Sequence, residues 1–261
     1  MLKSLQKAFK VKEVRDRLLY TFMMLVVIRI GCCLPIPGVN PQYLHQFFEN
    51  LQNSGMGFFN AITGGSFSSM SIFALSITPY ITASIIMQLL TIAIPKLEEM
   101  QKDGEDGRKK IAEYTRYLTV GLSLFESCAM AVGLGGKGLL LEDHRNIWGY
   151  LTVVAAMTAG SALLMWIGER ITDNGVGNGI SIVLLINIVS GTPQDMMTLY
   201  ERFMAGRSVA VATVSGIIVL AIIVAIVVFV LVLNDAERRI PVQYSKKMQG
   251  RRMIGGQSTY I

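Results

Sequence analysis

The chain has 261 residues, of which 52% are hydrophobic and 16% are charged, and its formal net charge is +6 at pH 7. This composition is too apolar and too poor in charge for an ordinary soluble domain. The first apolar run contains Arg29 and ends in two prolines rather than in a small-residue cleavage site, so we expect no cleavable signal peptide.

Six apolar stretches are long enough, or nearly so, to cross a bilayer as helices. They lie at about residues 18–34, 72–94, 117–134, 147–167, 176–192 and 209–233. If the N-terminus is cytoplasmic, the segments on the inner side carry 19 of the 24 Lys and Arg residues, and the segments on the outer side carry 4. Cytoplasmic segments of membrane proteins are enriched in Lys and Arg. The sequence therefore predicts an all-α, polytopic membrane helix bundle with six transmembrane helices and both ends in the cytoplasm.

Residues 1–17 form a predicted cytoplasmic segment in which apolar residues are interspersed with lysines. This pattern indicates a short amphipathic helix on the anionic inner leaflet, and a solvated basic tail is the alternative. After the first span, residues 34–38 (LPIPG) predict an extended exit from the membrane, because proline fixes φ and restricts the residue before it. We expect Arg29 to extend its side chain toward the outer interface.

A glycine-interrupted segment precedes the second predicted span. Residues 57–69 combine apolar side chains with Gly64, Gly65 and several serines, which weaken a helix, and the uncharged stretch 72–94 follows closely. Irregular backbone finds no hydrogen-bond partners in lipid, so at membrane depth it must be buried in protein or line a wet cavity. This arrangement favours a membrane protein that contains a pathway, although a surface re-entrant loop would show the same pattern.

Charged and glycine-rich segments connect the later spans. Residues 95–116 hold six basic and six acidic residues and predict a solvated hairpin that turns at Gly104 and Gly107. Glu126 lies within the third span, where a carboxylate is costly and usually faces a cavity or a polar partner. The glycines of residues 172–179 (TDNGVGNG) predict a tight reversal, and no strand precedes them as a dinucleotide site would require.

Residues 234–261 form a basic segment after the sixth span, and we expect it to be extended. Such a segment can contact lipid headgroups, RNA phosphates or an acidic protein surface. Alternatively, its charges act only as a topology signal. Its basic residues are Arg238, Arg239, Lys246, Lys247, Arg251 and Arg252.

The sequence contains no motif that indicates an enzyme, such as HExxH, GxSxG or a Walker A loop. Cys32, Cys33 and Cys128 have neither metal-ligand nor disulfide spacing, and His45 and His144 fall in connecting segments. We therefore expect no catalytic residue, no cofactor and no metal site. A conduit or a scaffold is favoured over an enzyme.

Five longer motifs resemble the SecY family, whose members are the central subunits of the bacterial Sec protein-conducting channel. They follow in order along nearly the whole chain: RIGCCLPIPGV (29–39), SIFALSITPYITASIIMQLL (71–90), DGRKKIAEYTRYLT (106–119), LMWIGERITDNGVGNGISI (164–182) and RRIPVQYSKKMQGRR (238–252). The resemblance implies a ten-helix, pseudo-symmetric channel with an external plug and a lateral gate to lipid. This chain would supply helices one to six, and it is truncated relative to the family.

The domain organisation implied by the resemblance has three parts. Residues 1–17 would be a cytoplasmic amphipathic segment, and residues 18–233 a six-helix transmembrane half-channel with a re-entrant plug helix at 57–69. Residues 234–261 would be a basic cytoplasmic loop. We expect Thr82, Gln88 and Asn187 to lack their partner half in this fragment.

The resemblance also assigns roles to individual residues. The aliphatic pore ring would consist of Ile77 and Ile81 from the second span and Ile180 and Leu184 from the fifth, and each pair is spaced i, i+4 so that it shares one helix face. The plug would include Phe58, Phe59, Ile62, Gly64, Gly65 and Phe67. The polar positions of the lateral gate would be Thr82, Gln88 and Glu126. The loop that binds a motor or a ribosome would use Arg238, Arg239, Lys246, Lys247, Arg251 and Arg252.

The implied function is that of a channel subunit in the cytoplasmic membrane, which passes unfolded secretory proteins across and releases membrane-protein helices into the bilayer. The implied partners are the SecE and SecG subunits, the SecA motor ATPase, the ribosome, secretory signal sequences and preproteins, and the lipid bilayer. An aliphatic ring can exclude ions by dewetting the constriction. The glycines and serines of the plug would give it low local stability.

Two other functions remain open from the residues alone. Half of a secondary transporter would also combine broken helices with an inverted repeat. An assembly or insertase scaffold would have the same spans but no pore. In either case, the four ring residues would be ordinary helix-packing residues, and Glu126 could pair with a basic residue of a partner subunit.

Overall fold

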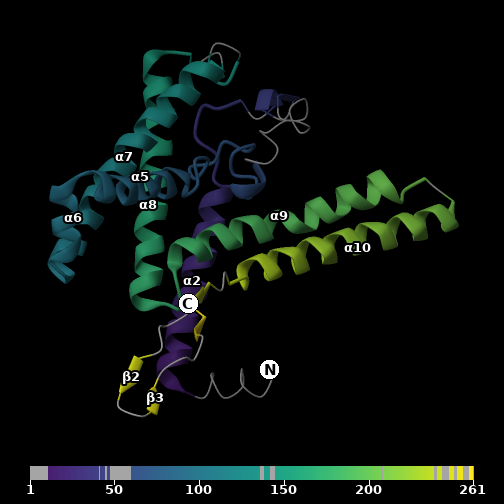
Figure 1. Cartoon of the computed structure of the whole chain (residues 1–261). Helices are drawn as coiled ribbons and strands as arrows, with labels where there is room; N and C mark the ends of the chain where they lie inside the picture. The colour runs from purple at the N-terminus through teal and green to yellow at the C-terminus, as the bar shows by residue number, and fades with distance from the viewer. Residues whose placement is uncertain are drawn as a thin grey trace. The chain divides into compact units, whose positions relative to one another are not determined.

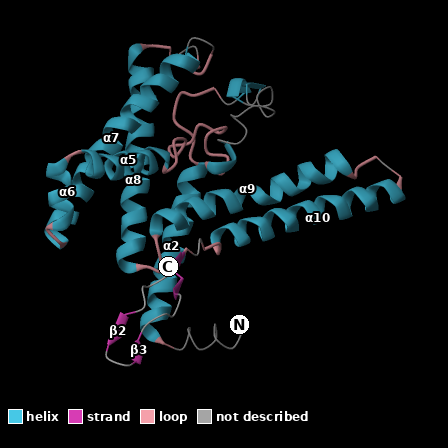
Figure 2. Cartoon of the chain, in the orientation of Figure 1, coloured by secondary structure: helices cyan, strands magenta, loops and turns pink. Residues whose placement is uncertain are grey.

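The computed structural model describes residues 11–40, 42–44, 46–47, 60–135, 138–141, 145–206, 208–237, 240–242, 247–249, 252–254 and 259–260. Within these ranges helices predominate, and the named strands all lie after residue 240 (Figure 2). The chain divides into two compact units, Met1–Gln194 and Asp195–Ile261, and the division falls inside helix α9 (Gly179–Phe203). The predicted helical fold is therefore confirmed.

In the described part of the first unit, five longer helices precede α9. They are α2 (Lys12–Cys33), α5 (Thr78–Ala93), α6 (Pro95–Lys102), α7 (Glu105–Gly135) and α8 (Ile147–Asn174). Helix α8 is central to the packing, because α7, α5 and α2 all contact it (Figure 1). Residues 147–167 were predicted to form the fourth span, and the helix observed there continues to Asn174.

Four helices in the described ranges are long and apolar enough to span a membrane: Glu105–Leu134, Ile147–Asn174, Gly179–Phe203 and Ala210–Asn234. The bent pair α5 and α6 is a fifth candidate. Helix α2 covers the first predicted span, but any 18-residue stretch of it contains Asp16, Arg17 and Arg29, so it is too charged for this class. The third predicted span, 117–134, is the second half of a longer helix that begins at Glu105.

The second predicted span is helical only from Thr78 onward, so the expectation of a helix over 72–94 is wrong at its start. Residues 72–77 are instead turns, and Ser76 has a φ of +54°. Pro79 lies at the beginning of α5, where its fixed φ suits the first helical turn and its missing N–H costs no hydrogen bond. Residues 60–62 are helical but residues 63–69 form turns, so the prediction of a plug helix over 57–69 is wrong for 63–69. The irregular segment extends from Thr63 through Ile77 and leads directly into α5.

A sharp bend of 102° separates α5 from α6. Ile94 between them has φ −110° and ψ 112°, the extended conformation that a residue before proline prefers. The predicted hairpin turns at Gly104, which has a φ of +79°, but the prediction for Gly107 is wrong because Gly107 is part of α7. A Cβ atom on Gly107 would run into the carbonyl oxygen of Met100, so this glycine allows α6 to pack on the first turns of α7.

The predicted extended exit after α2 is confirmed for residues 34–36, whereas Pro37 and Gly38 form a turn in which Gly38 has a φ of +83°. Ile36 donates its backbone N–H to Met70 O at 3.1 Å, and Ile72 donates to Leu34 O at 3.0 Å. Pro35 and Ser71 form an antiparallel bridge between the same two stretches. These bonds satisfy backbone groups of an irregular segment that helices and strands leave unpaired.

The second unit contains the end of α9, helix α10 (Val209–Asn234) and four short strands. Strand β1 (Pro241–Val242) pairs with β4 (Thr259–Tyr260), and β2 (Lys247–Gln249) pairs with β3 (Arg252–Ile254), both antiparallel. These pairs agree with the extended segment predicted for residues 234–261.

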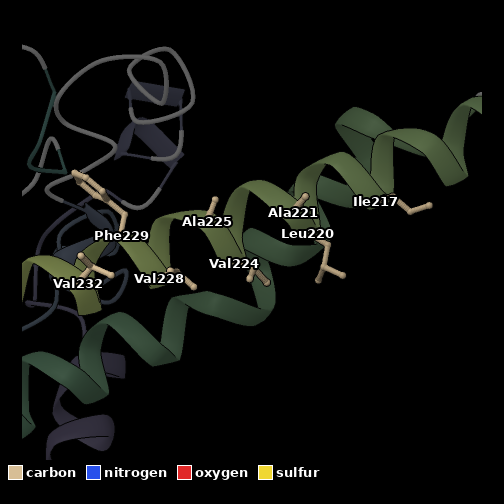
Figure 3. A pocket seen from close by; sticks show the side chains of 8 residues that line it. All are labelled: Ile217, Leu220, Ala221, Val224, Ala225, Val228, Phe229 and Val232. Atoms are coloured by element: carbon tan, nitrogen blue, oxygen red, sulfur yellow. The ribbon is translucent and has the colours of Figure 1, made fainter.

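Helix α10 is apolar around its circumference, and none of its most apolar 18-residue window is buried. One of its faces forms an open groove without polar side chains (Figure 3). A surface of this kind is typical of a helix that contacts acyl chains or another apolar helix. The groove is lined by Ile217, Leu220, Ala221, Val224, Ala225, Val228, Phe229 and Val232.

Candidate functional site

Three of the four predicted ring residues meet in one hydrophobic cluster. Ile77 is the residue that precedes α5 and is 1% exposed, and its carbonyl accepts the N–H of Ile81 at 3.2 Å, which preserves the predicted i, i+4 relation. Ile81 and Ile180 are half-buried and pack against the same cluster. Leu184 is half-buried on α9 and is not among the described residues of this cluster. The fully buried members are Ile28, Cys32, Phe73, Ile77, Leu164, Ile167, Ile171 and Val183.

Two glycines allow Ile77, which directly precedes α5, to lie close to Ile180 of α9. A Cβ atom on Gly168 of α8 would lie 2.7 Å from Cδ1 of Ile180 and 3.5 Å from Cδ1 of Ile77, so both isoleucines approach the same point of the α8 backbone. A Cβ atom on Gly179 would run into the carbonyl oxygen of Gly168. The close approach of α8 and α9 at these glycines positions Ile180 beside Ile77. Because Ile77 is buried, it forms part of a closed apolar core in this structure.

The part of the predicted plug that the structure describes is compact and internally bonded. Phe58 and Phe59 lie outside the described residues. The Asn60 carboxamide oxygen accepts the N–H of Ser68 at 3.0 Å, and Thr63 Oγ1 accepts the N–H of Phe67 at 3.4 Å. Gly64 and Gly65 have positive φ values, +65° and +81°, which glycine adopts without steric cost.

Phe67 anchors this segment in a second hydrophobic cluster. Its side chain is 4% exposed and belongs to a cluster that includes Met70 and Leu75 from the same segment and Val153 and Met157 from α8. Ile62 is half-buried. Low local stability was expected for the glycine- and serine-rich sequence, but residues 63, 66, 67, 70 and 71 are all buried. Any outward movement of this segment must therefore break packed contacts.

The three predicted gate residues lie on two helices that pack together, α5 and α7. Thr82 donates its hydroxyl to Thr78 O at 3.1 Å within its own helix. Gln88 is exposed, and Glu126 on α7 is half-buried. Among the described contacts, none joins the three side chains to one another.

Asn187 is a polar residue whose importance the sequence did not reveal. It is 1% exposed on α9, donates from Nδ2 to Ser76 Oγ at 3.0 Å, and accepts at Oδ1 from the thiol of Cys32 at 3.9 Å. We expected the polar face of Asn187 to lack its partner half, but the structure provides both hydrogen-bond partners of this amide within the chain. An uncompensated buried amide is costly, so an asparagine in an apolar span was the available signal that partners exist.

The glycine-rich reversal between α8 and α9 is held by the first turns of α2. The N–H of Val176 donates to Thr21 Oγ1 at 3.2 Å, and Arg17 Nη1 donates to Gly175 O at 3.4 Å. Asn178 caps α9, because its Oδ1 accepts the N–H of Ile180 at 3.0 Å. This cap fixes the start of α9 and therefore the position of Ile180, the residue directly after Gly179.

The predicted binding loop is described only in part. Arg238, Arg239, Lys246 and Arg251 lie outside the described residues. The backbone of Lys247 is in β2 and that of Arg252 is in β3, and in this hairpin Lys247 is opposite Ile254 and Gln249 is opposite Arg252.

Comparison with known proteins identifies the family. A family model described as SecY matches residues 71–261, which is more than half of the chain. The chain belongs to the SecY family. A protein translocase subunit SecY from Streptomyces scabiei is 43% identical over 273 aligned residues, which cover 100% of this chain and 61% of that protein.

Another SecY relative, from Pseudomonas aeruginosa, is 41% identical over 249 residues, covering 95% of this chain and 55% of that protein. The chain thus spans between half and two thirds of the length of these SecY proteins. A solved SecY structure, from work on how the plug domain stabilises the closed state of the translocation channel, matches with a TM-score of 0.50 and 18% identity over 94% of this chain and 52% of that chain. Together with its span-length helices, family membership makes this chain a multi-pass membrane protein.

Proposed function

We propose that this chain forms the N-terminal part of a protein-conducting channel in the cytoplasmic membrane. The observation that carries the proposal is the convergence of Ile77, which directly precedes α5, and Ile180 of α9 on the backbone of Gly168. Aliphatic side chains that meet in this way can close a narrow passage against water and ions without binding a passing polypeptide. Ile81 and Leu184, one turn further along each helix, would complete the contribution of this chain to the ring.

In this proposal the plug is residues 57–69, and the gate to lipid involves Thr82, Gln88 and Glu126. Polar side chains along an apolar helix seam lower the cost of separating the helices, so a hydrophobic signal sequence could enter between them. The half-buried Glu126 suits this role because a carboxylate within a span usually faces a cavity or a polar partner. The chain itself would carry out no covalent chemistry.

The proposed substrates are unfolded secretory proteins and hydrophobic membrane-protein segments. The proposed partners are SecE, SecG, the SecA motor and the ribosome, with the motor or ribosome contacting the basic loop 234–261. The excess of Lys and Arg in residues 1–17, 95–116 and 234–261 supports a cytoplasmic N-terminus and cytoplasmic loops. Basic loops on that side can bind carboxylates or phosphates.

Ion conductance tests the ring directly. The full-length protein with Ile81→Gly or Ile180→Gly should leak ions in planar bilayers in the absence of any substrate, because removing an aliphatic side chain lets water enter the constriction. Leu185→Gly is a matched control, since Leu185 is an exposed residue of α9. Equal conductance in all three variants and the unaltered protein would contradict the proposed ring.

A further inference from the structure

One face of α9 is buried in the first unit, and one of the three buried residues on this face is polar. The buried residues of the helix are Gly179, Val183 and Asn187, which are spaced by four and therefore lie on one stripe. Gly179 and Val183 serve close packing against α8 and the ring cluster. Asn187 occupies a position where an aliphatic residue would suffice for packing, so its amide calls for a separate explanation.

The Asn187 side chain joins α9 to two other parts of the fold. Its Nδ2 donates to Ser76 Oγ, at 3.0 Å, in the residue before Ile77. Its Oδ1 accepts from the Cys32 thiol, which lies near the end of α2. The amide nitrogen and the amide oxygen of Asn187 therefore each have a hydrogen-bond partner, and the stronger bond is the one to Ser76 in the irregular segment.

The backbone of α9 at the same place contacts the other end of that segment. A Cβ atom on Gly64 would lie 2.6 Å from Asn187 O and 2.9 Å from Ser190 Oγ, so the Gly64 backbone packs directly on α9. Residues 64 and 76 are twelve positions apart in sequence, yet both contact Asn187. The intervening loop, residues 64–76, thus contacts α9 at both of its ends. Gly64 packs on the backbone of Asn187 and on the Ser190 hydroxyl, and Ser76 bonds to the Asn187 side chain.

Ser76 is held in a conformation that it would not adopt freely. Its φ of +54° lies in the left-handed region, which is unfavourable for residues other than glycine, asparagine and aspartate. The hydrogen bond from Asn187 supplies a specific interaction that holds Ser76 in this conformation. If the bond breaks, Ser76 can relax, and the loop then loses one of its two attachments to α9.

We propose that Asn187 clamps loop 64–76 onto α9 and thereby keeps the plug segment seated. This inference rests on the proposed channel function and adds to it a positioning residue outside the ring, the plug and the gate. Asn187 follows Ile180 by two helical turns on α9, and Ser76 directly precedes Ile77. Opening of the ring between α5 and α9 would therefore pull on the clamp, which links movement of the ring to release of the plug.

Cys32 is a native reporter for the clamp because it is buried and bonded to Asn187, whereas Cys33 and Cys128 are exposed. The full-length protein in liposomes, with Cys33→Ser, Cys128→Ser and any further cysteines replaced, is treated with N-ethylmaleimide. In Asn187→Leu, we expect labelling of Cys32 to become roughly five to ten times faster, because the loss of one buried hydrogen bond makes opening around Cys32 more frequent by about this factor. Ion conductance without substrate should rise in parallel.

Thr192→Val is the matched control, because Thr192 is exposed on the same helix and its hydroxyl donates to Ile188 O within that helix. Ser76→Ala removes the same hydrogen bond from the other side and carries the test if Asn187→Leu does not fold. Combined with Asn187→Leu, it should add little further labelling. The exchanged pair Ser76→Asn with Asn187→Ser should slow the labelling again, because asparagine tolerates positive φ and restores a donor and an acceptor.

The two readouts separate the clamp from the channel function. Labelling and conductance that both stay at the level of Thr192→Val in Asn187→Leu and Ser76→Ala would overturn the clamp. Faster labelling with unchanged conductance would support the clamp as a structural contact but would contradict the proposed role of this region in sealing a pore. Faster labelling in the exchanged pair than in either single variant would also count against the Asn187–Ser76 bond.

Discussion

The guanidinium Nε of Arg116 lies 2.8 Å from Oε1 of Glu169, and this ion pair joins α7 to α8 on the side of the bundle where Gly168 meets Gly179. The Arg116 side chain is 48% exposed and that of Glu169 is 23% exposed, so solvent screens the pair. We predict a coupling of about 1 kcal/mol or less in a double-mutant cycle of Arg116→Ala and Glu169→Ala. Thermal unfolding in detergent at low and high salt measures it, and a salt-independent coupling of several kcal/mol would contradict this view.

The close contact between Gly168 and Gly179 should tolerate substitution far less well than the Arg116–Glu169 ion pair does. Gly179→Ala places a methyl group against the Gly168 carbonyl, and such overpacking costs about 1–3 kcal/mol in the free energy of unfolding. Gly121→Ala in α7 is the control, because a Cβ atom there meets nothing within 4 Å and alanine favours a helix by about 1 kcal/mol. If thermal unfolding showed that both variants were equally stable, the close approach of α8 and α9 would be excluded.

Substitution by alanine should have different effects at the adjacent residues Gly64 and Gly65. Gly64 and Gly65 both have positive φ, but a Cβ atom on Gly64 meets Asn187 and Ser190 whereas one on Gly65 meets nothing within 4 Å. Gly65→Ala should therefore cost only the left-handed strain, about 1–2 kcal/mol. Gly64→Ala should lower the melting temperature further and increase ion leak, because it also pushes the loop away from α9.

The basic loop gives a prediction about binding. Arg251→Glu with Arg252→Glu should weaken association of the full-length protein with its motor or with ribosomes, because the change reverses two charges on the proposed contact. Arg202→Glu with Arg207→Glu, on the predicted outer side, is the control. Unaltered affinity at physiological salt in the first variant would reduce the loop to a topology signal.

Much of the fold could be predicted from the apolar runs of the sequence and from the prolines and glycines between them. The uncharged run at 209–233 corresponds to α10 almost residue for residue, and Pro35 lies in the extended exit after α2. The start of α5 could not be predicted from composition, because residues 72–77 are as apolar as a helix. Local turn bonds, such as Ser76 N to Phe73 O, act there together with tertiary contacts. The bond between Ile72 N and Leu34 O is one such contact.

The candidate site was predictable in its composition but not in its geometry. The i, i+4 spacing of Ile77 and Ile81 could be read directly, whereas the meeting of Ile77 with Ile180 depends on glycines in α8 and α9 that permit close approach. The clamp at Asn187 depends on residues from three distant stretches of chain, and nothing in the local sequence around Ser76 signals its positive φ. Such long-range pairs are set by packing and not by periodicity.

The apolar surface of α10 bears on how the helix is rotated about its own axis. Because it is apolar on every side, its own sequence does not determine which face turns toward protein and which toward lipid. Its rotation about the helix axis must be chosen by whatever packs against it. Ser215 donates its hydroxyl to Phe203 O at 3.0 Å and fixes that part of the helix. From Gly216 to Leu233 the side chains are all apolar, so substitutions there should be tolerated in pairs that move bulk from one side of the helix to another.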